Sequence, residues 1–200
     1  MRCFPRLMLI VLWPALATSE QALTSVGPLA YYAVERAIDP IVVDGKLDEF
    51  SWERSNQINN LDRILNDYAD VHFATRSKML WDDEYFYFSF VCQDADIWAI
   101  YENEDDRLWE EEVVEVFIDP DGDGKDYAEI HINSLDTIND IWIPNNKFKY
   151  ANGEPVDWPD LYTWTQVGMR HAAMNHGTVN DSTDVDQGSV FEFALPWEGF

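Results

Sequence analysis

Apolar and polar residues alternate over several short segments of this chain, a pattern typical of β-strands with one buried face. Residues 85–91 are the clearest case, because Phe86, Phe88, Phe90 and Cys92 all fall on one side. Side chains of neighbouring strand residues point to opposite faces, so this apolar side is expected to point into a core.

Turn-forming residues separate the alternating segments from one another. The pattern predicts further strands at residues 28–36, 41–43, 71–80, 113–118, 127–133, 137–143, 161–170 and 190–195. A short helix is expected near Asp48, with loops at 56–70, 97–112, 145–160 and 174–188. The strands at 113–118 and 127–133 should form a hairpin. Short strands separated by turns favour an all-β fold, an antiparallel β-sandwich.

The first residues carry the features of a secretory signal peptide. Arg2 and Arg6 precede an apolar run that ends in Ala15-Leu16-Ala17, which fits a small-x-small cleavage site. The run is too short to span a bilayer. We therefore expect residues 1–17 to be removed, 18–37 to form a leader and first strand, and 38–200 to form one domain. The mature chain is expected to be secreted, extracellular or periplasmic, and not bound to a membrane.

Acidic residues far outnumber basic ones, with 38 Asp and Glu against 13 Lys and Arg and a formal net charge of −25. Such a surface repels phosphate backbones and anionic lipids, so we expect no nucleic-acid partner. Nine Trp, nine Tyr and eleven Phe make the chain rich in aromatic rings, most of which a sandwich would bury. Cys3 would leave with the signal peptide, so Cys92 would remain without a disulfide partner.

The segment around Trp109 combines an aromatic ring with an acid held in a strand. An acidic cluster follows Trp109, and Glu115 lies six residues further on, inside an apolar strand. A sugar offers a C–H face that packs on a flat ring and hydroxyls that donate to a carboxylate. Trp109 and Glu115 are therefore candidate carbohydrate-binding residues. The alternative is that Glu115 is an ordinary exposed strand residue.

Four polar residues alternate on one face of the next strand: Tyr127, Glu129, His131 and Asn133. Hairpin pairing would place their side chains beside Glu115. These side chains could hydrogen-bond several hydroxyls at once, although polar residues also form the solvated side of many sandwiches.

The turn between these two strands contains Asp119, Asp121 and Asp123. Alternating aspartates can bind calcium, but an EF-hand requires Glu at its twelfth position, where Ile130 stands. The preferred interpretation is a turn held by bonds from backbone N–H groups to aspartate side chains. Calcium stays open as a ligand, here or among the aspartates of residues 94–106, and no other cofactor is expected.

Enzyme signatures are sparse. No GxSxG, Walker, HExxH or dinucleotide-binding motif occurs, and the four histidines lack metal-ligand spacing. A glycoside hydrolase would need two carboxylates, and the sequence singles out no pair. A haem-binding redox module would need axial ligands, for which Met169 and His171 are candidates by residue type alone. We expect no catalysis by this chain and keep these two classes as alternatives.

Five motifs in order make the chain resemble the family 9 carbohydrate-binding modules (CBM9) and their DOMON-like relatives. The motifs are residues 43–49 with Trp52, 80–87, 109–119, 127–133 and 193–197. The resemblance implies a sandwich of jelly-roll or immunoglobulin-like type that binds carbohydrate. It also implies a role beside xylanases and other glycoside hydrolases in the breakdown of plant-type polysaccharides.

The resemblance assigns roles to particular residues. Trp109 matches the first of two tryptophans that hold sugar in the family, and Glu115 matches its hydrogen-bonding glutamate. His131 stands where the family has an arginine, and Asn133 matches a recurrent asparagine.

The family continues past the motif that ends at Trp197, with strands that carry the second tryptophan. We therefore expect that the sandwich lacks its last strands here and that a catalytic domain could follow Phe200. Within the chain, Trp142, Trp158 and Trp164 are the candidates for a second ring.

Overall fold

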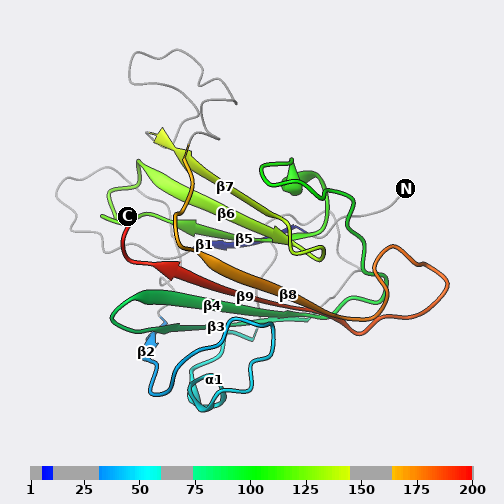
Figure 1. The fold of residues 1–200 in the computed structure, drawn as a ribbon, viewed down its shortest axis with the longest axis horizontal. Coiled ribbons are helices and arrows are strands. Elements are labelled where there is room, and N and C mark those ends of the chain that lie inside the picture. The colour runs from blue at the N-terminus through cyan, green and yellow to red at the C-terminus, as the bar shows by residue number, and fades with distance from the viewer. Residues whose placement is uncertain (1–5, 11–31, 60–73, 145–163, 200) are drawn as a thin grey trace, which may run out of the picture.

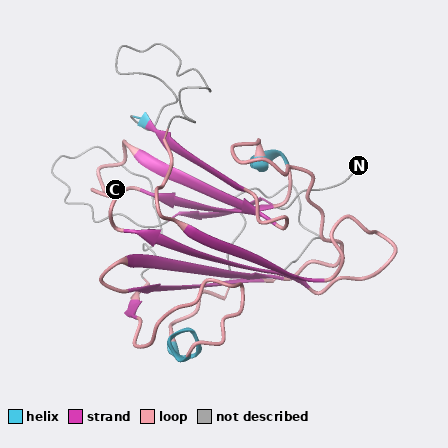
Figure 2. Cartoon of the chain, viewed as in Figure 1, coloured by secondary structure: helices cyan, strands magenta, loops and turns pink. Residues whose placement is uncertain are grey.

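The computed structural model describes residues 6–10, 32–59, 74–144 and 164–199, and these form two β-sheets packed face to face (Figures 1 and 2). The four-stranded sheet has the order β1 (Arg6–Ile10), β5 (Val113–Ile118), β6 (Tyr127–Asn133), β7 (Ile138–Ile143). The five-stranded sheet has the order β2 (Glu35–Arg36), β3 (Thr75–Trp81), β4 (Tyr85–Cys92), β9 (Gly188–Pro196), β8 (Arg170–His176). The described helices are α1 (Phe50–Arg54) and the single 3-10 turn η2 (Leu108–Glu110). The predicted all-β sandwich is confirmed.

The main core lies between the two sheets. The four-stranded sheet contributes mainly aliphatic side chains, among them Val114, Val116, Ile130 and Ile132. The five-stranded sheet contributes mainly rings, namely Phe88, Phe90, Phe191 and Phe193. The inward face predicted for residues 85–91 is therefore correct, with Phe86 and Cys92 packing at the edge of this core. Burial raises the pKa of the Cys92 thiol to about 12, as expected for a small buried side chain.

The segment from Ala37 to Arg54 covers the outer face of the five-stranded sheet. Trp52 is completely buried there against Leu80, Tyr87 and Ala194. The chain approaches so closely that a Cβ on Gly45, whose φ is +76°, would lie 2.7 Å from the Cβ of Met174. Only glycine meets both demands at this position.

Two predicted strands differ from the structure. Residues 41–43 are irregular, because Val42 N bonds to the carboxylate of Glu49 rather than to a neighbouring strand. The turn that follows is held in the same way, by Gly45 N and Glu192. The strand predicted at 161–170 is instead β8, so the predicted loop at 174–188 begins too early. Residues 164–169 contain a turn closed by Met169 N and Gln166 O.

The other sequence predictions are close in position. Of the strand predicted at 28–36, only β2 is present among the described residues, and it pairs with β3 in parallel. The hairpin of β5 and β6 is confirmed. The helix near Asp48 begins at Phe50. The loop expected at 145–160 lies outside the described residues.

Strand β1 was not predicted. It pairs in parallel with β5, from Arg6 beside Val113 to Ile10 beside Phe117. Its residues fall inside the segment predicted to be a signal peptide. Removal of that segment stays a prediction, and the pairing shows which edge the segment occupies while it is present.

Candidate functional site

A row of polar side chains crosses the outer face of the four-stranded sheet. Val114 and Val116 point into the core, so Glu115 between them points outward. Strand register places His131 of β6 opposite Glu115, and Asn139 of β7 opposite His131. The three side chains are buried, at 9%, 2% and 0% exposure. We call Glu115, His131 and Asn139 the polar row.

Two members of the polar row have unused hydrogen-bonding groups. Both ring nitrogens of His131 and both amide atoms of Asn139 are buried and have no hydrogen-bond partner among the described residues. Oε2 of Glu129 lies 3.6 Å from Nε2 of His131, which is too long for a hydrogen bond. A buried polar group left without a partner costs about 1–3 kcal/mol. The protein therefore maintains an unfavourable arrangement at this spot.

Trp109 lies beside the polar row. Its η2 turn contacts β6, and the ring is half-buried. The indole meets the imidazole of His131 edge-on, with ring centroids 6.2 Å apart and planes at 77°. Trp109 and Glu115 are thus both neighbours of His131, which brings together three of the four residues that the sequence predicted. Whether they bind sugar stays a prediction.

Asn133, the fourth predicted residue, holds the loop that carries Trp109. Its amide nitrogen donates to Tyr101 O (2.8 Å) and to Glu111 Oε1 (2.6 Å), and its Oδ1 accepts from Leu135 N and Thr137 N. Glu111 is itself buried and accepts from Ile100 N and Tyr101 N. With these bonds made, Asn133 positions the Trp109 loop.

A second outward row adds to the site. Phe117 and Glu129 are cross-strand partners one step along from the polar row, and the ring of Phe117 lies 6.1 Å from that of Tyr127. Burial, together with the neighbouring Glu129, raises the pKa of Tyr127, which keeps the hydroxyl protonated. The face therefore combines carboxylates, an imidazole, an amide and aromatic rings. These groups suit a ligand with many hydroxyls and no negative charge.

The candidates for a second ring lie elsewhere. Trp142 follows Ile141 on β7, so it points to the opposite side of the sheet from Asn139, and its ring packs 5.7 Å from that of Trp164. Trp158 lies outside the described residues. On the site face itself, Phe117 is the ring that the structure adds.

The aspartate turn forms as a compact acidic group. One carboxylate oxygen from each of Asp119, Asp121 and Asp123 lies within 4.8 Å of the others. Asp119 accepts from Gly122 N and Gly124 N, and Asp123 pairs with Lys125. The turn is thus held by aspartate–backbone bonds, and calcium binding there stays a prediction.

The haem alternative gains no axial pair from Met169 and His171. Met169 packs against the main core, while His171 Nδ1 lies 2.9 Å from Asp136 Oδ1. The two residues are also separated by a single position in the chain, so they cannot face each other across a ring system. Within the described part of the chain, no helix has the length and apolar character needed to cross a membrane.

Sequence reasoning missed Asn139 and Glu111. Asn139 could have been noticed, because it interrupts an otherwise apolar segment between Ile138 and Ile141 together with Asp140. Glu111 is one of three consecutive glutamates, and nothing in the sequence separates it from Glu110 and Glu112.

A two-layer β-sandwich with an aromatic side chain beside polar groups on an outer sheet face has the architecture of a carbohydrate-binding module. The profile of the family "Carbohydrate family 9 binding domain-like" matches residues 43–199. The chain belongs to this family.

The fold has a counterpart among solved structures. A candidate carbohydrate-binding protein from Bacteroides uniformis ATCC 8492 is similar with a TM-score of 0.58 and 12% identity, over 85% of this chain and 73% of that one. At this identity the likeness supports the fold alone. No curated protein matches the chain.

Proposed function

We propose that this chain is a secreted, non-catalytic module that binds a saccharide on the outer face of the four-stranded sheet. A pyranose ring packs on Trp109, and its hydroxyls bond to Glu115, His131 and Asn139. The proposal rests on four buried side-chain atoms of His131 and Asn139 that have no hydrogen-bond partner in the described ranges of the chain. Sugar hydroxyls both donate and accept, so they can satisfy an imidazole and an amide together.

The proposal gives Asn133 an indirect role. Its amide is engaged by the Trp109 loop, so it positions the ring instead of contacting sugar. The amide contact falls to Asn139, which lies on the next strand and has both polar atoms unused.

Binding requires a local movement. The unpartnered atoms of His131 and Asn139 are buried from solvent, whereas Trp109 beside them is only half-buried. Saccharide can reach those atoms once the Trp109 side chain or its loop shifts, a rotamer-scale change that is common at interfaces. Such a site is expected to bind more slowly than an open platform.

Export and biological context extend the proposal. The predicted signal peptide supports secretion, and membership of the family supports a role in polysaccharide breakdown, with a plant-type polysaccharide as ligand and a glycoside hydrolase as functional partner. Glycoside hydrolysis by this chain is not part of the proposal. That reaction needs two carboxyl groups that act as acid and base, and the geometry of the described site does not single out such a pair.

Binding to neutral oligosaccharides, measured by glycan array and then by calorimetry, tests the site. Trp109→Ala should weaken binding at least about tenfold, because it removes the stacking surface. Trp81→Ala, which removes an exposed ring on the other sheet, serves as the matched control and should leave affinity unchanged. Equal binding by the wild type and Trp109→Ala would overturn the proposed platform.

A further inference from the structure

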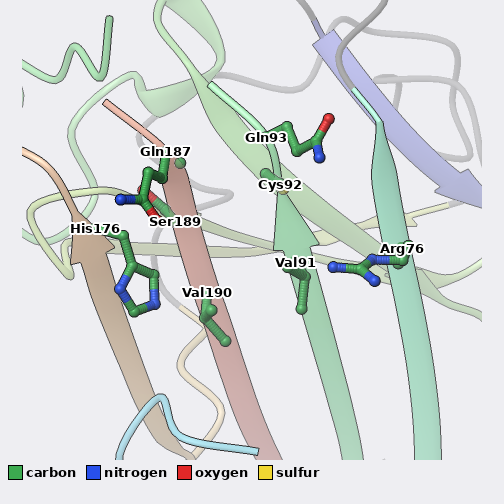
Figure 3. A pocket seen from close by; sticks show the side chains of 9 residues that line it. Arg76, Val91, Cys92, Gln93, His176, Gln187, Ser189 and Val190 are labelled. Carbon is green, nitrogen blue, oxygen red and sulfur yellow. The ribbon is translucent and has the colours of Figure 1, made fainter. Parts of the chain in front are cut away.

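A groove of about 450 Å³ lies on the opposite side of the sandwich, on the outer face of the five-stranded sheet (Figure 3). Val91 of β4 and Val190 of β9 are cross-strand partners and form its floor. Arg76 of β3 and His176 of β8 stand on its two sides, as Figure 3 shows. The groove is remote from the polar row, because the whole core separates the two outer faces.

The groove has an unusual charge for this protein. The chain carries 38 acidic residues, yet none of the described ones lines the groove, whose polar side chains are Arg76, Gln93, His176, Gln187 and Ser189. Two acids are next to lining residues along the chain, and both are engaged elsewhere: Asp94 with Asp96 N and with Glu112, and Asp186 with Ile97 N and Thr178 N.

Arg76 differs from the other described cationic side chains. The other arginines and lysines whose side chains the structure describes each meet a carboxylate, an aromatic ring or a backbone carbonyl: Arg36, Lys46, Arg54, Lys78, Arg107, Lys125 and Arg170. Within the described residues, Arg76 has no such partner. Its charge also reaches Lys78, whose pKa is lowered by burial first and by Arg76 second. A buried or half-buried negative group would be stabilised beside this pair of cations.

We propose that this groove binds the carboxylate of an acidic saccharide, a uronic-acid unit. Arg76 bonds the carboxylate in bidentate fashion, and the apolar ring face rests on Val91 and Val190. His176 and Gln187 then bond the hydroxyls of the next unit. Arg76 and His176 lie on strands three spacings apart, about 14 Å at about 4.8 Å per spacing, which accommodates more than one sugar unit. This site is independent of the neutral-sugar site beside Trp109.

Calorimetric titration with digalacturonate and with its methyl ester tests the assignment. The ester keeps the sugar and removes the charge. Digalacturonate should bind at least about tenfold more tightly than the ester, and Arg76→Gln should abolish that preference. Arg107→Gln removes one positive charge from an exposed position outside the groove and should retain it. Arg76→Lys should recover only part of the affinity, because lysine cannot form the bidentate contact.

The two sites fail separately. Trp109→Ala should lose neutral-sugar binding and keep digalacturonate binding, while Arg76→Gln should do the reverse. Equal affinity for acid and ester, equal loss in Arg76→Gln and Arg107→Gln, or no binding at millimolar digalacturonate would each overturn the acidic-sugar site and leave the proposed function intact.

Discussion

The two outer faces of this sandwich bury polar side chains in opposite ways. On the five-stranded sheet, Glu192 is fully buried and accepts from Trp52 Nε1, Asp44 N and Gly45 N. On the four-stranded sheet, the side chains of His131 and Asn139 are similarly buried, and they have no hydrogen-bond partner within the part of the chain that the structure describes. The burial of a polar side chain therefore does not by itself tell whether that side chain stabilises the fold or belongs to a binding site.

The difference lies in what each arrangement does for stability. The bonds to Glu192 fasten residues 37–54 to the sheet, so removing that carboxylate should cost stability. The unpartnered atoms of the polar row cost stability in the free protein and can be repaid when a ligand bonds them. A buried polar group that stabilises nothing is the stronger indicator of a binding site.

The largest effect is expected for Glu192→Ala. It leaves three donors of the covering segment without an acceptor, so we expect the free energy of unfolding to fall by about 3 kcal/mol. Urea denaturation measures this. Glu102→Ala, which removes an exposed glutamate, is the control and should have little effect. Similar losses of stability in the two variants would mean that Glu192 does not hold residues 37–54 on the sheet.

A pH dependence of nearly the same size follows from the same carboxyl. Burial raises the pKa of Glu192 from 4.5 to about 7, so the folded state holds its proton more tightly than the unfolded state. This contribution is complete below about pH 4.5 and is lost as pH rises through about 7. The free energy of unfolding should therefore fall by about 2–3 kcal/mol over that range. Chemical denaturation at several pH values should show a flatter profile for Glu192→Gln.

Asn133→Ala should have an intermediate effect. It removes the amide that joins Glu111 and Tyr101 to β6, at a cost of about 2 kcal/mol. The Trp109 loop should then exchange its amide hydrogens faster, while those of β4 stay protected. Unchanged exchange in residues 100–111 would show that Asn133 does not hold the loop.

The smallest effect on stability, and of opposite sign, is expected for Asn139→Leu. Leucine has a similar shape and removes two buried unpartnered atoms, so the protein should gain up to about 1 kcal/mol. Saccharide affinity should nevertheless fall about tenfold. A stable variant that keeps its affinity would separate the polar row from binding.

Strands in which apolar and polar residues alternate strongly could be predicted from the sequence. Phe86, Phe88 and Phe90 predicted β4 and its inward face, and the hairpin register then brought Glu115 beside His131. The irregular path of residues 41–45 could not be predicted, because its backbone N–H groups bond to side-chain carboxylates: Val42 N to Glu49, and Asp44 N and Gly45 N to the distant Glu192. The two-residue period of a strand shows which side chains share a face, and it does not show which distant residues contact that face.

The same limit applies to the site. Glu111 and Asn139 acquire their roles from loop packing and from the third strand of the sheet, and neither is visible in a two-residue period. Trp109 and Glu115 were predicted because a ring and an acid lie near each other in the sequence, and the structure places each of them beside His131.

If residues 1–17 were removed, as the sequence predicts, the four-stranded sheet would lose β1, which pairs with β5. Cleavage after Ala17 would take away Arg6–Ile10 and leave the outward peptide groups of Val113–Phe117 open to water or to another chain. The strand that carries Glu115 would become a border strand upon maturation. Handling of the processed form should therefore favour low concentration and conditions that discourage fibrous self-association.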